Sequence, residues 1–451
     1  MTYETFLEGK RFRREPVGFR ATFLPEKAFD FQKELIVWNC RQGRSATFAD
    51  CGMGKGLIIL AWAENIIRHA ATSNGKHPKV LIAAPLAVAQ QFVREAEKFG
   101  IPITLCRDGN PKRGINVTNY HQLHKFHAKD FIGFGADESS IIKNADGKTR
   151  RFITKFVQTI PYRYLGTATP APNDFMELGT SSEILGNMTR GQMLSTFFVN
   201  GGETTQQWSL KGHAKRRFWE WVGTWARALR KPSDIGYSDK GFDLPELTTE
   251  HHAIKSGKES FGFFPDLNRT LDDQRAEDKR TVRERCEKAV SLVPKDRPCI
   301  VWCHYNQEGD LLQKMLSDSI QVAGKHDSEE KEEKLIGFSM GNHRVLVTKP
   351  KIAGFGLNWQ HCSDVIYFPS HSHESYYQAI RRCWRFGQTK PVKVHLVYSE
   401  ANKIIVDNML RKERQSHEMY AGIVRSMKTS QLHQEAIKEI YETIQLPRWM
   451  K

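Results

Sequence analysis

Two stretches of the chain alternate short apolar runs with helical patterns, and this alternation constrains the fold more than any other feature. The strand-like runs of the first stretch, which covers about residues 29–170, are 46–50, 79–84, 115–118 and 162–166. Those of the second stretch, which covers about residues 298–398, are 299–303, 345–348, 365–368 and 392–397. Strands that alternate with helices pair in parallel, because each crossover helix covers one face of the sheet. The pattern therefore predicts an α/β chain with two parallel-sheet domains.

The segments around these two stretches set the predicted domain boundaries. We expect the first domain to cover residues 1–245, with a helical insertion at about 175–240. The strongly charged residues 246–297 predict a linker, and residues 298–420 the second domain. The remaining residues, 421–451, have a helical pattern and predict a C-terminal tail.

Composition narrows the class of partner. The chain has 67 Lys and Arg against 51 Asp and Glu, a formal net charge of +16, which favours a polyanionic partner and most simply nucleic acid. Hydrophobic residues make up 39% of the chain, which excludes disorder as the main state. The sequence has no run of 18 apolar residues and no secretory pattern at its start, so we expect no membrane span and a cytoplasmic protein.

Cysteine and histidine offer no metal site by spacing. The 8 cysteines are sparse and irregularly spaced, which predicts free thiols. The 17 histidines show no spacing typical of metal ligands. His251 and His252 are adjacent and would point to opposite faces of a strand, so the sequence assigns them no role.

Tryptophans and basic residues gather in the predicted insertion. Trp208, Trp219, Trp221 and Trp225 accompany the basic run 215–217. Aromatic rings that stack on bases and cations that meet phosphates would form a nucleic-acid surface. Tryptophans at helical spacing more often belong to the core, and we favour the core here.

A phosphate cradle is the first chemical motif. The run 46–50 is followed by Cys-Gly-Met-Gly-Lys-Gly at 51–56 and then by a helical pattern. Glycines let backbone N–H groups point inward, the helix N-terminus adds positive potential, and Lys55 can reach terminal phosphates. Ala49, Gly54 and Lys55 fit the usual pattern, whereas Gly56 lacks the hydroxyl that binds Mg²⁺. A purely structural turn is the alternative interpretation of this segment taken alone.

An acidic pair follows the run 131–136. Asp137 would hold Mg²⁺ and Glu138 would activate the attacking water in metal-nucleotide hydrolysis. The alternative interpretation of an isolated Asp-Glu pair is a surface loop. The hydroxyl-bearing segment 166–170, Gly-Thr-Ala-Thr-Pro, is by itself only a loop.

The order of these motifs resembles the superfamily-2 helicase-type ATPases, and looks closest to the Swi/Snf-like branch found in phage and mobile elements. The resemblance covers about residues 29–397. It places Gln32 as the adenine-reading glutamine, and residues 84–86 with 91–92 and 117–120 as the motifs that contact a nucleic-acid strand. Residues 137–144 resemble the Asp-Glu box, and residues 167–173 resemble the motif that couples hydrolysis to domain movement.

The second half completes the resemblance. Residues 300–305 resemble the strand that opens the second lobe, and residues 354–358 resemble the Gly-x-Gly-Leu-Asn motif. Residues 378–388 match the family pattern Gln-Ala-x-x-Arg-x-x-Arg-x-Gly-Gln at every fixed position. Arg382 and Arg385 are three apart, so a helix would put both on one face. From the second lobe they would stabilise charge on the transferring phosphoryl group, which couples hydrolysis to lobe closure.

The resemblance implies two RecA-like lobes with ATP in the cleft between them, Mg²⁺ as cofactor, and nucleic acid crossing both lobes. The residues implied to be catalytic are Lys55, Asp137, Glu138, Arg382 and Arg385, with Asp137 as the metal ligand. Those implied to bind the nucleotide are Gln32, Gly52, Met53, Gly54, Lys55, Gly56 and Leu57. Those implied to contact nucleic acid are Pro85, Thr118 and Asn119. Those implied to couple hydrolysis to movement are Thr167, Thr169, Gly354, Gly356 and Gln378.

The chain departs from the family at Gly56, which lacks the expected hydroxyl, and at Gly133 and Gly135, which make the strand before Asp137 less apolar than usual. By resemblance, we expect an ATP-driven DNA helicase or duplex DNA translocase, in a bacterial host cell if the gene is phage-encoded. Two alternatives stay open: an RNA helicase, and a module of the same fold that binds nucleotide and hydrolyses it weakly because of Gly56.

Overall fold

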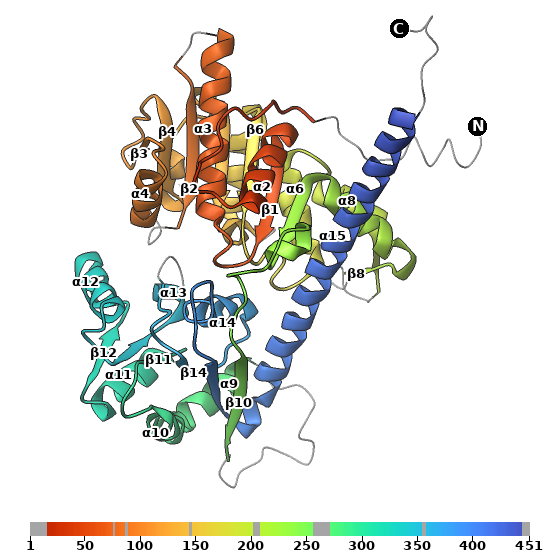
Figure 1. Cartoon of the computed structure of the whole chain (residues 1–451). Helices are drawn as coiled ribbons and strands as arrows, with labels where there is room; N and C mark the ends of the chain where they lie inside the picture. The colour runs from red at the N-terminus through yellow and green to blue at the C-terminus, as the bar shows by residue number, and fades with distance from the viewer. Residues whose placement is uncertain are drawn as a thin grey trace, which may run out of the picture. The chain divides into compact units, whose positions relative to one another are not determined.

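The chain forms two compact units in the computed structural model (Figure 1). The structure describes residues 16–74, 77–85, 89–143, 147–201, 208–255, 271–353 and 358–443. Unit 1 comprises Met1–Asp239 with Ser416–Lys451, and unit 2 comprises Lys240–Gln415. The chain therefore passes from one unit to the other twice.

A seven-stranded parallel sheet is the centre of unit 1, in the order β3-β4-β2-β5-β6-β1-β9. Its strands are β1 Arg44–Ala49, β2 Lys79–Ala84, β3 Ile103–Leu105, β4 Gly114–Asn119, β5 Gly133–Asp137, β6 Tyr162–Gly166 and β9 Ala226–Leu229. Strands β1, β2, β4 and β6 are buried from their second residue onward, and β5 is buried throughout, as expected for a sheet covered on both faces. The helices of unit 1 are α2 Asp30–Gln42, α3 Lys55–Asn74, α4 Ala89–Lys98, α5 Lys148–Phe156, α6 Leu178–Leu185, α7 Arg190–Phe197 and α8 Lys215–Trp225.

Unit 2 is built on a six-stranded parallel sheet in the order β10-β15-β14-β11-β13-β12. Its strands are β10 Leu247–Ile254, β11 Cys299–Trp302, β12 Ser319–Val322, β13 Val345–Thr348, β14 Asp364–Tyr367 and β15 Val392–Ser399. Its helices are α9 Leu271–Arg280, α10 Val282–Leu292, α11 Asn306–Met315, α12 Ser328–Ser339, α13 Pro350–Ala353 and α14 His373–Ile380. The prediction of two parallel-sheet α/β domains is confirmed.

The segment predicted as a charged linker, residues 246–297, is instead part of unit 2. Strand β10 pairs with β15 along its whole length, from Leu247 opposite Val392 to Ile254 opposite Ser399. Helix α10 buries Cys286 in the same core cluster as Val301. The segment is therefore strongly charged and yet structured, and one of its charged side chains, Arg285 on α10, is itself buried.

The predicted insertion and tail also differ in detail. Residues 175–240 hold helices α6, α7 and α8 and a two-stranded hairpin, β7 Phe198–Asn200 with β8 Trp208–Leu210, but they also supply β9 to the main sheet. The long helix α15, Lys403–Thr443, begins before the predicted tail boundary. From Ser416 onward it counts with unit 1, where a Cβ on Gly422 would lie 2.8 Å from the ring of Trp219.

The tryptophans of α8 belong to the core, as favoured from their spacing. Trp219, Trp221 and Trp225 are each no more than 5% exposed. The ring of Trp221 contacts Phe197 of α7, and the ring of Trp219 contacts Phe218 on α8 itself. All eight cysteines are buried free thiols, as predicted. None of the helices in the described part of the chain is both long enough and apolar enough to cross a membrane.

Candidate active site at the carboxyl edge of the unit 1 sheet

A glycine-rich loop joins β1 to α3. Strand β1 ends at Ala49 and helix α3 begins at Lys55. Gly52 and Gly54 adopt φ values of 91° and 81°, which side chains other than glycine rarely allow. A Cβ on Gly54 would also lie 2.3 Å from Nε2 of Gln32, so a side chain there would displace Gln32 as well as strain the backbone. The loop therefore brings backbone N–H groups to the N-terminus of a 20-residue helix, the geometry that binds phosphate.

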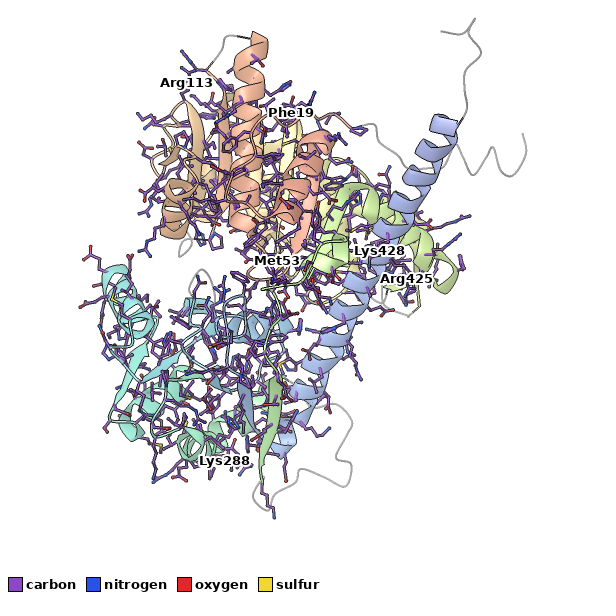
Figure 2. All side chains as sticks on the ribbon, in the orientation of Figure 1. Phe19, Met53, Arg113, Lys288, Arg425 and Lys428 are labelled. Atoms are coloured by element: carbon purple, nitrogen blue, oxygen red, sulfur yellow. The ribbon has the colours of Figure 1, made fainter. Side chains whose placement is uncertain are left out.

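Gln32 and Lys55 both hold this loop. Gln32 on α2 donates from Nε2 to the carbonyl of Met53 at 3.1 Å, and its Oε1 accepts from the N–H of Phe29 at 3.0 Å. Lys55 donates from Nζ to the carbonyl of Ala49 at 3.0 Å, inside the loop. Both side chains therefore reach the loop, in which Figure 2 labels Met53. The contacts of Gln32 with adenine and of Lys55 with phosphate stay predictions.

Gly56 faces a carboxylate that the sequence did not single out. A Cβ on Gly56 would lie 2.2 Å from Oε2 of Glu95, on helix α4. The carboxylate of Glu95 therefore takes the space in which a Ser or Thr side chain would carry its hydroxyl. No local pattern signals this neighbour, because α3 and α4 meet only through the tertiary fold. Met53 and Leu57, the other predicted loop residues, are buried at 4% and 2% exposure.

The acidic pair lies on the strand next but one to β1. Asp137 ends β5 and is paired in register with Gly166, the last residue of β6, while β6 pairs in turn with β1. Glu138 has a φ of 48°, the one left-handed non-glycine residue in the described ranges. A side chain in this region costs about 1–2 kcal/mol, and such strain is typical of functional sites.

Thr167 and Thr169 follow β6 and complete this edge. The hydroxyl of Thr167 donates to Oε2 of Glu138 at 3.4 Å, and the N–H of Thr169 donates to the Thr167 hydroxyl at 3.0 Å. Both threonines are buried, at 1% and 2% exposure. The predicted catalytic carboxylate and the predicted coupling residues are thus directly connected.

Burial dominates the electrostatics of Asp137. Burial first, and then the neighbouring charge of Glu138, raise the pKa of Asp137 to about 7. Lys55 acts in the opposite direction, and Glu95 adds to the rise. Three carboxylates thus crowd one ammonium group, and a cation bound there would relieve their repulsion.

The glycines of β5 let helix α3 approach the sheet. A Cβ on Gly135 would lie 2.8 Å from Cδ1 of Ile59 and 3.4 Å from the ring of Trp62, both on α3. A Cβ on Gly133 would lie 3.0 Å from Cδ1 of Ile66. The two glycines make this strand less apolar than usual because larger side chains would collide with α3. They allow α3 to pack closely against the sheet.

The residues predicted to contact nucleic acid lie together but are buried. Pro85 follows β2, and Ala84 is paired in register with Asn119, the last residue of β4. Thr118 and Asn119 are 3% and 5% exposed, and Asn119 caps the short helix Tyr120–Lys125 by accepting from the N–H of His121 at 3.1 Å. Both side chains are thus buried at the end of β4, and their contact with nucleic acid stays a prediction.

Unit 2 places the predicted arginines in a turn, and the expectation that a helix presents both on one face is wrong. Helix α14 ends at Ile380, two residues before Arg382. Arg382 is 4% exposed and donates from Nε and Nη2 to the carbonyl and the Oε1 of Gln378, each at 3.1 Å. Arg385 is half-buried in the turn that Gly387 closes with a φ of 89°. Gly354 and Gly356 lie outside the described residues.

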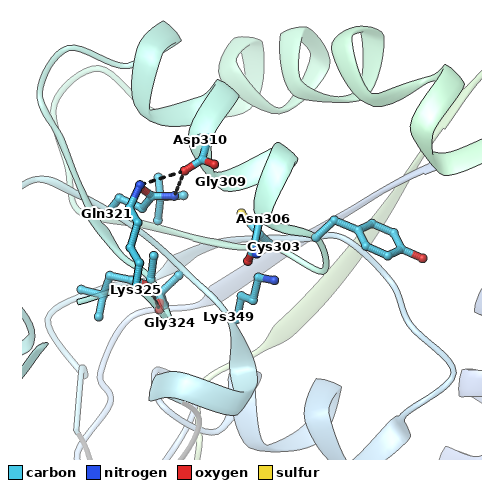
Figure 3. Close-up of a pocket in the computed structure, with 13 residues that line it drawn as sticks. Cys303, Asn306, Gly309, Asp310, Gln321, Gly324, Lys325 and Lys349 are labelled. Carbon is cyan, nitrogen blue, oxygen red and sulfur yellow. Dashed lines mark hydrogen bonds and ion pairs between the residues drawn. The ribbon is translucent and has the colours of Figure 1, made fainter. Parts of the chain in front are cut away.

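A cavity of about 200 Å³ lies at the carboxyl ends of β11, β12 and β13 (Figure 3). Lys325 and Lys349 line it, as does Asn306 at the start of α11. The carboxylate of Asp310 accepts a hydrogen bond from Nε2 of Gln321 at 3.1 Å and lies 3.5 Å from the ammonium of Lys325. Sequence reasoning missed this cavity, because its lining comes from three loops that are far apart in the chain.

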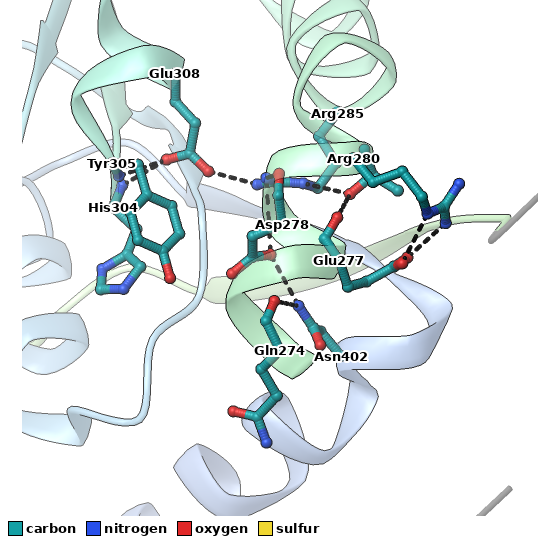
Figure 4. Close-up of polar contacts among 10 residues, drawn as sticks. Gln274, Glu277, Asp278, Arg280, Arg285, His304, Tyr305, Glu308 and Asn402 are labelled. Atoms are coloured by element: carbon teal, nitrogen blue, oxygen red, sulfur yellow. Dashed lines mark hydrogen bonds and ion pairs between the residues drawn. The ribbon is translucent and has the colours of Figure 1, made fainter. Parts of the chain in front are cut away.

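A buried ion pair supports the same edge of unit 2 (Figure 4). The guanidinium of Arg285 meets Glu308 at 2.5 Å, and the side chains are 3% and 0% exposed. The other oxygen of Glu308 accepts from the N–H groups of His304 and Tyr305, both at 2.8 Å, at the start of α11. Arg285 also donates to the carbonyl of Asp278 at 2.6 Å, so each charge in this network has a partner.

The second unit matches a known domain family. Residues 283–387 match the helicase conserved C-terminal domain. A search of curated proteins found no match.

Known structures share the two-lobed fold. The chain is similar to S. cerevisiae Dbp5 bound to RNA and ADP BeF3, at 12% identity and a TM-score of 0.54, over 88% of this chain and 94% of that one. A point variant of Dbp5 with the same ligands gives 13% identity and a TM-score of 0.53, over 89% and 94%. A further Dbp5 complex, with Gle1 and IP6, gives 13% identity and a TM-score of 0.50, over 85% of each chain. The two units are therefore RecA-like lobes, as predicted, and the domain match supports a nucleic-acid-dependent, ATP-driven helicase.

Proposed function

We propose that the chain is a nucleic-acid-dependent ATPase of the superfamily-2 helicase type, and that it moves along DNA as a helicase or duplex translocase. The observation that carries the proposal is the convergence of Lys55, Asp137, Glu138 and Thr167 at one edge of the unit 1 sheet. These four residues come from three neighbouring strands, and active sites of parallel α/β sheets occupy this edge.

The residues present fit a nucleotide with a divalent cation. The glycine-rich loop would hold phosphate at the N-terminus of α3, because Gly52 and Gly54 adopt positive φ values and Lys55 begins the helix. Asp137 would hold Mg²⁺, which when bound supplies positive charge against the phosphate oxygens. Glu138 would accept a proton from the attacking water. Because the hydroxyl of Thr167 bonds Glu138, a change in the charge of Glu138 would alter this hydrogen bond and so act on the segment after β6.

DNA is proposed as the track because residues 378–388 carry the Swi/Snf-like form of the last motif, and a net charge of +16 suits a phosphate backbone. RNA is the second candidate, because the Dbp5 structures with a similar fold are RNA complexes. The roles of Arg382 and Arg385 as γ-phosphate sensors belong to the proposal.

Phosphate release measured with duplex DNA, single-stranded DNA and RNA tests the function and its track. We expect duplex DNA to stimulate most, and stimulation by RNA alone would overturn the DNA proposal. Lys55→Ala should abolish the stimulated rate, while Lys155→Ala, an exposed lysine of α5, should leave it unchanged. Equal rates for Lys55→Ala and the parent chain would overturn the ATPase proposal.

A weakly hydrolysing module is favoured by one observation, the missing hydroxyl at Gly56. Gly56→Thr should raise the rate of phosphate release by roughly 10-fold, because a hydrogen-bonding ligand to a charged group is worth about 1–3 kcal/mol. The far end of Glu95 must move for the threonine to fit, since its Oε2 lies 2.2 Å from the new Cβ position. Gly56→Thr in a Glu95→Gln background tests whether the carboxylate limits the gain. Nucleotide binding without turnover in the parent chain would favour the module.

A further inference from the structure

Three possible metal ligands meet on one face of the unit 2 sheet. Glu250 and His252 are two residues apart on β10, so both point to the same face. His395 on β15 is paired in register with Glu250. His252 Nε2 lies 3.0 Å from His395 Nδ1, and Glu250 Oε2 lies 3.2 Å from His395 Nδ1 and 3.7 Å from His252 Nε2.

This triangle has the size of one face of a tetrahedral zinc site. Zinc binds histidine nitrogen and carboxylate oxygen at about 2.0–2.1 Å, which places ligand atoms about 3.3 Å apart at tetrahedral angles. The three observed separations scatter around that value. All three atoms already point at one another, so a metal ion would need little movement of the side chains.

Neighbouring charged groups orient the carboxylate of Glu250 and act on both histidines. Lys393 contacts Oε1 of Glu250 at 3.2 Å, which fixes the carboxylate while Oε2 faces the histidines. Burial lowers the pKa of both His252 and His395, and Glu250 acts in the opposite direction on both. The positive charge of Lys288 on α10 (Figure 2) also lowers both pKa values. A metal ion bound between the three residues would replace the hydrogen bond between His252 Nε2 and His395 Nδ1.

We propose that Glu250, His252 and His395 bind a divalent zinc-class ion that ties β10 to β15. Strand β10 lies at the edge of the sheet, with β15 as its one neighbour. It is the first strand of unit 2 after the chain enters it, and β15 is the last before the chain leaves. The ion would therefore hold the entering and the leaving strand together, with its fourth position open to water on the side of Glu250, whose side chain is 46% exposed.

Metal binding to the full chain tests this proposal without any measurement of ATP turnover. After chelation and removal of the chelator, CoCl₂ should give the visible absorption of a tetrahedral site, and ZnCl₂ should abolish it at one equivalent. Zinc at about 100 times its dissociation constant should also raise the unfolding midpoint of unit 2 by roughly 5–10 °C. The absence of a tetrahedral cobalt spectrum would overturn the proposal.

The neighbouring histidine provides a matched control. His252→Gln should weaken zinc binding by more than about 100-fold, since even the loss of a residue that only hydrogen-bonds a metal ligand costs 10- to 100-fold. His251→Gln, on the same strand and the opposite face, should bind zinc like the parent chain. Glu250→Gln, at a half-exposed position, gives a second variant if His252→Gln folds poorly. Equal losses in His251→Gln and His252→Gln, or no loss in either ligand variant, would show that zinc binds elsewhere and contradict the proposal.

Discussion

The two RecA-like units differ in how the buried charged groups at the carboxyl edges of their sheets are neutralised. In unit 1, burial and the neighbouring Glu138 raise the pKa of Asp137 to about 7, and Glu138 sits in a strained backbone conformation. In unit 2, Arg285 and Glu308 are more deeply buried but fully partnered. Backbone strain at a carboxylate, which is typical of functional sites, therefore marks the edge that carries the proposed chemistry, while the buried ion pair of unit 2 has its hydrogen-bond partners. We infer that the crowded carboxylates and the strained backbone of Glu138 lower the free energy of unfolding of unit 1.

The largest effect should come from Glu138. Glu138→Gln should lower nucleic-acid-stimulated phosphate release by about 10²- to 10⁴-fold, because an amide cannot accept the proton of the attacking water. Nucleotide binding should persist and the unfolding midpoint should not fall. A loss of stability instead of turnover would place Glu138 among the structural charges, as in unit 2.

The matching change in unit 2 should affect stability. Arg285→Met should lower the free energy of unfolding by about 3–5 kcal/mol, because it leaves Glu308 buried and unpaired. Arg283→Met, two residues earlier on α10, removes an exposed pair with Glu287 and should cost less than about 1 kcal/mol. Urea unfolding of both variants checks the difference, and equal costs would contradict a distinct buried network.

The raised pKa of Asp137 predicts a pH dependence of stability. Its folded value of about 7 exceeds the unfolded value of 3.8, so between these values the folded state binds more protons. The free energy of unfolding should therefore fall as pH rises from about 4 to about 7, by on the order of a few kcal/mol, and stay flat above. Asp137→Asn should remove this slope in urea unfolding at a series of pH values. A slope that survives in Asp137→Asn would assign it to other groups.

A smaller effect should follow from the packing of α3 on β5. Gly135→Ala should destabilise unit 1 by about 1–3 kcal/mol, because its Cβ would lie 2.8 Å from Ile59. Gly191→Ala on α7 has open space around the new methyl and should be neutral or stabilising by up to about 1 kcal/mol. If Gly135→Ala also weakens nucleotide binding, the close approach of α3 positions the loop as well as the core.

Local patterns predicted the strands well and the boundaries poorly. The buried runs 46–50, 79–84 and 162–166 read clearly because parallel strands covered on both faces are apolar throughout. Strand β10 was not recognised, because an edge strand that carries Glu250, His251 and His252 has the polar composition of a charged linker. The turn after Ile380 also escaped, since a helical spacing of Arg382 and Arg385 says nothing about where a helix ends.

By itself, the sequence determined the two parallel-sheet domains, the glycine loop before Lys55 and the acidic pair at the end of β5, because each is signalled by residues that are close along the chain. Only the tertiary structure decided that Glu95 faces Gly56 and that His395 meets Glu250 and His252. These partners are separated by 39 to 145 positions, and pairings of that kind follow from strand order and helix packing, which no local pattern encodes.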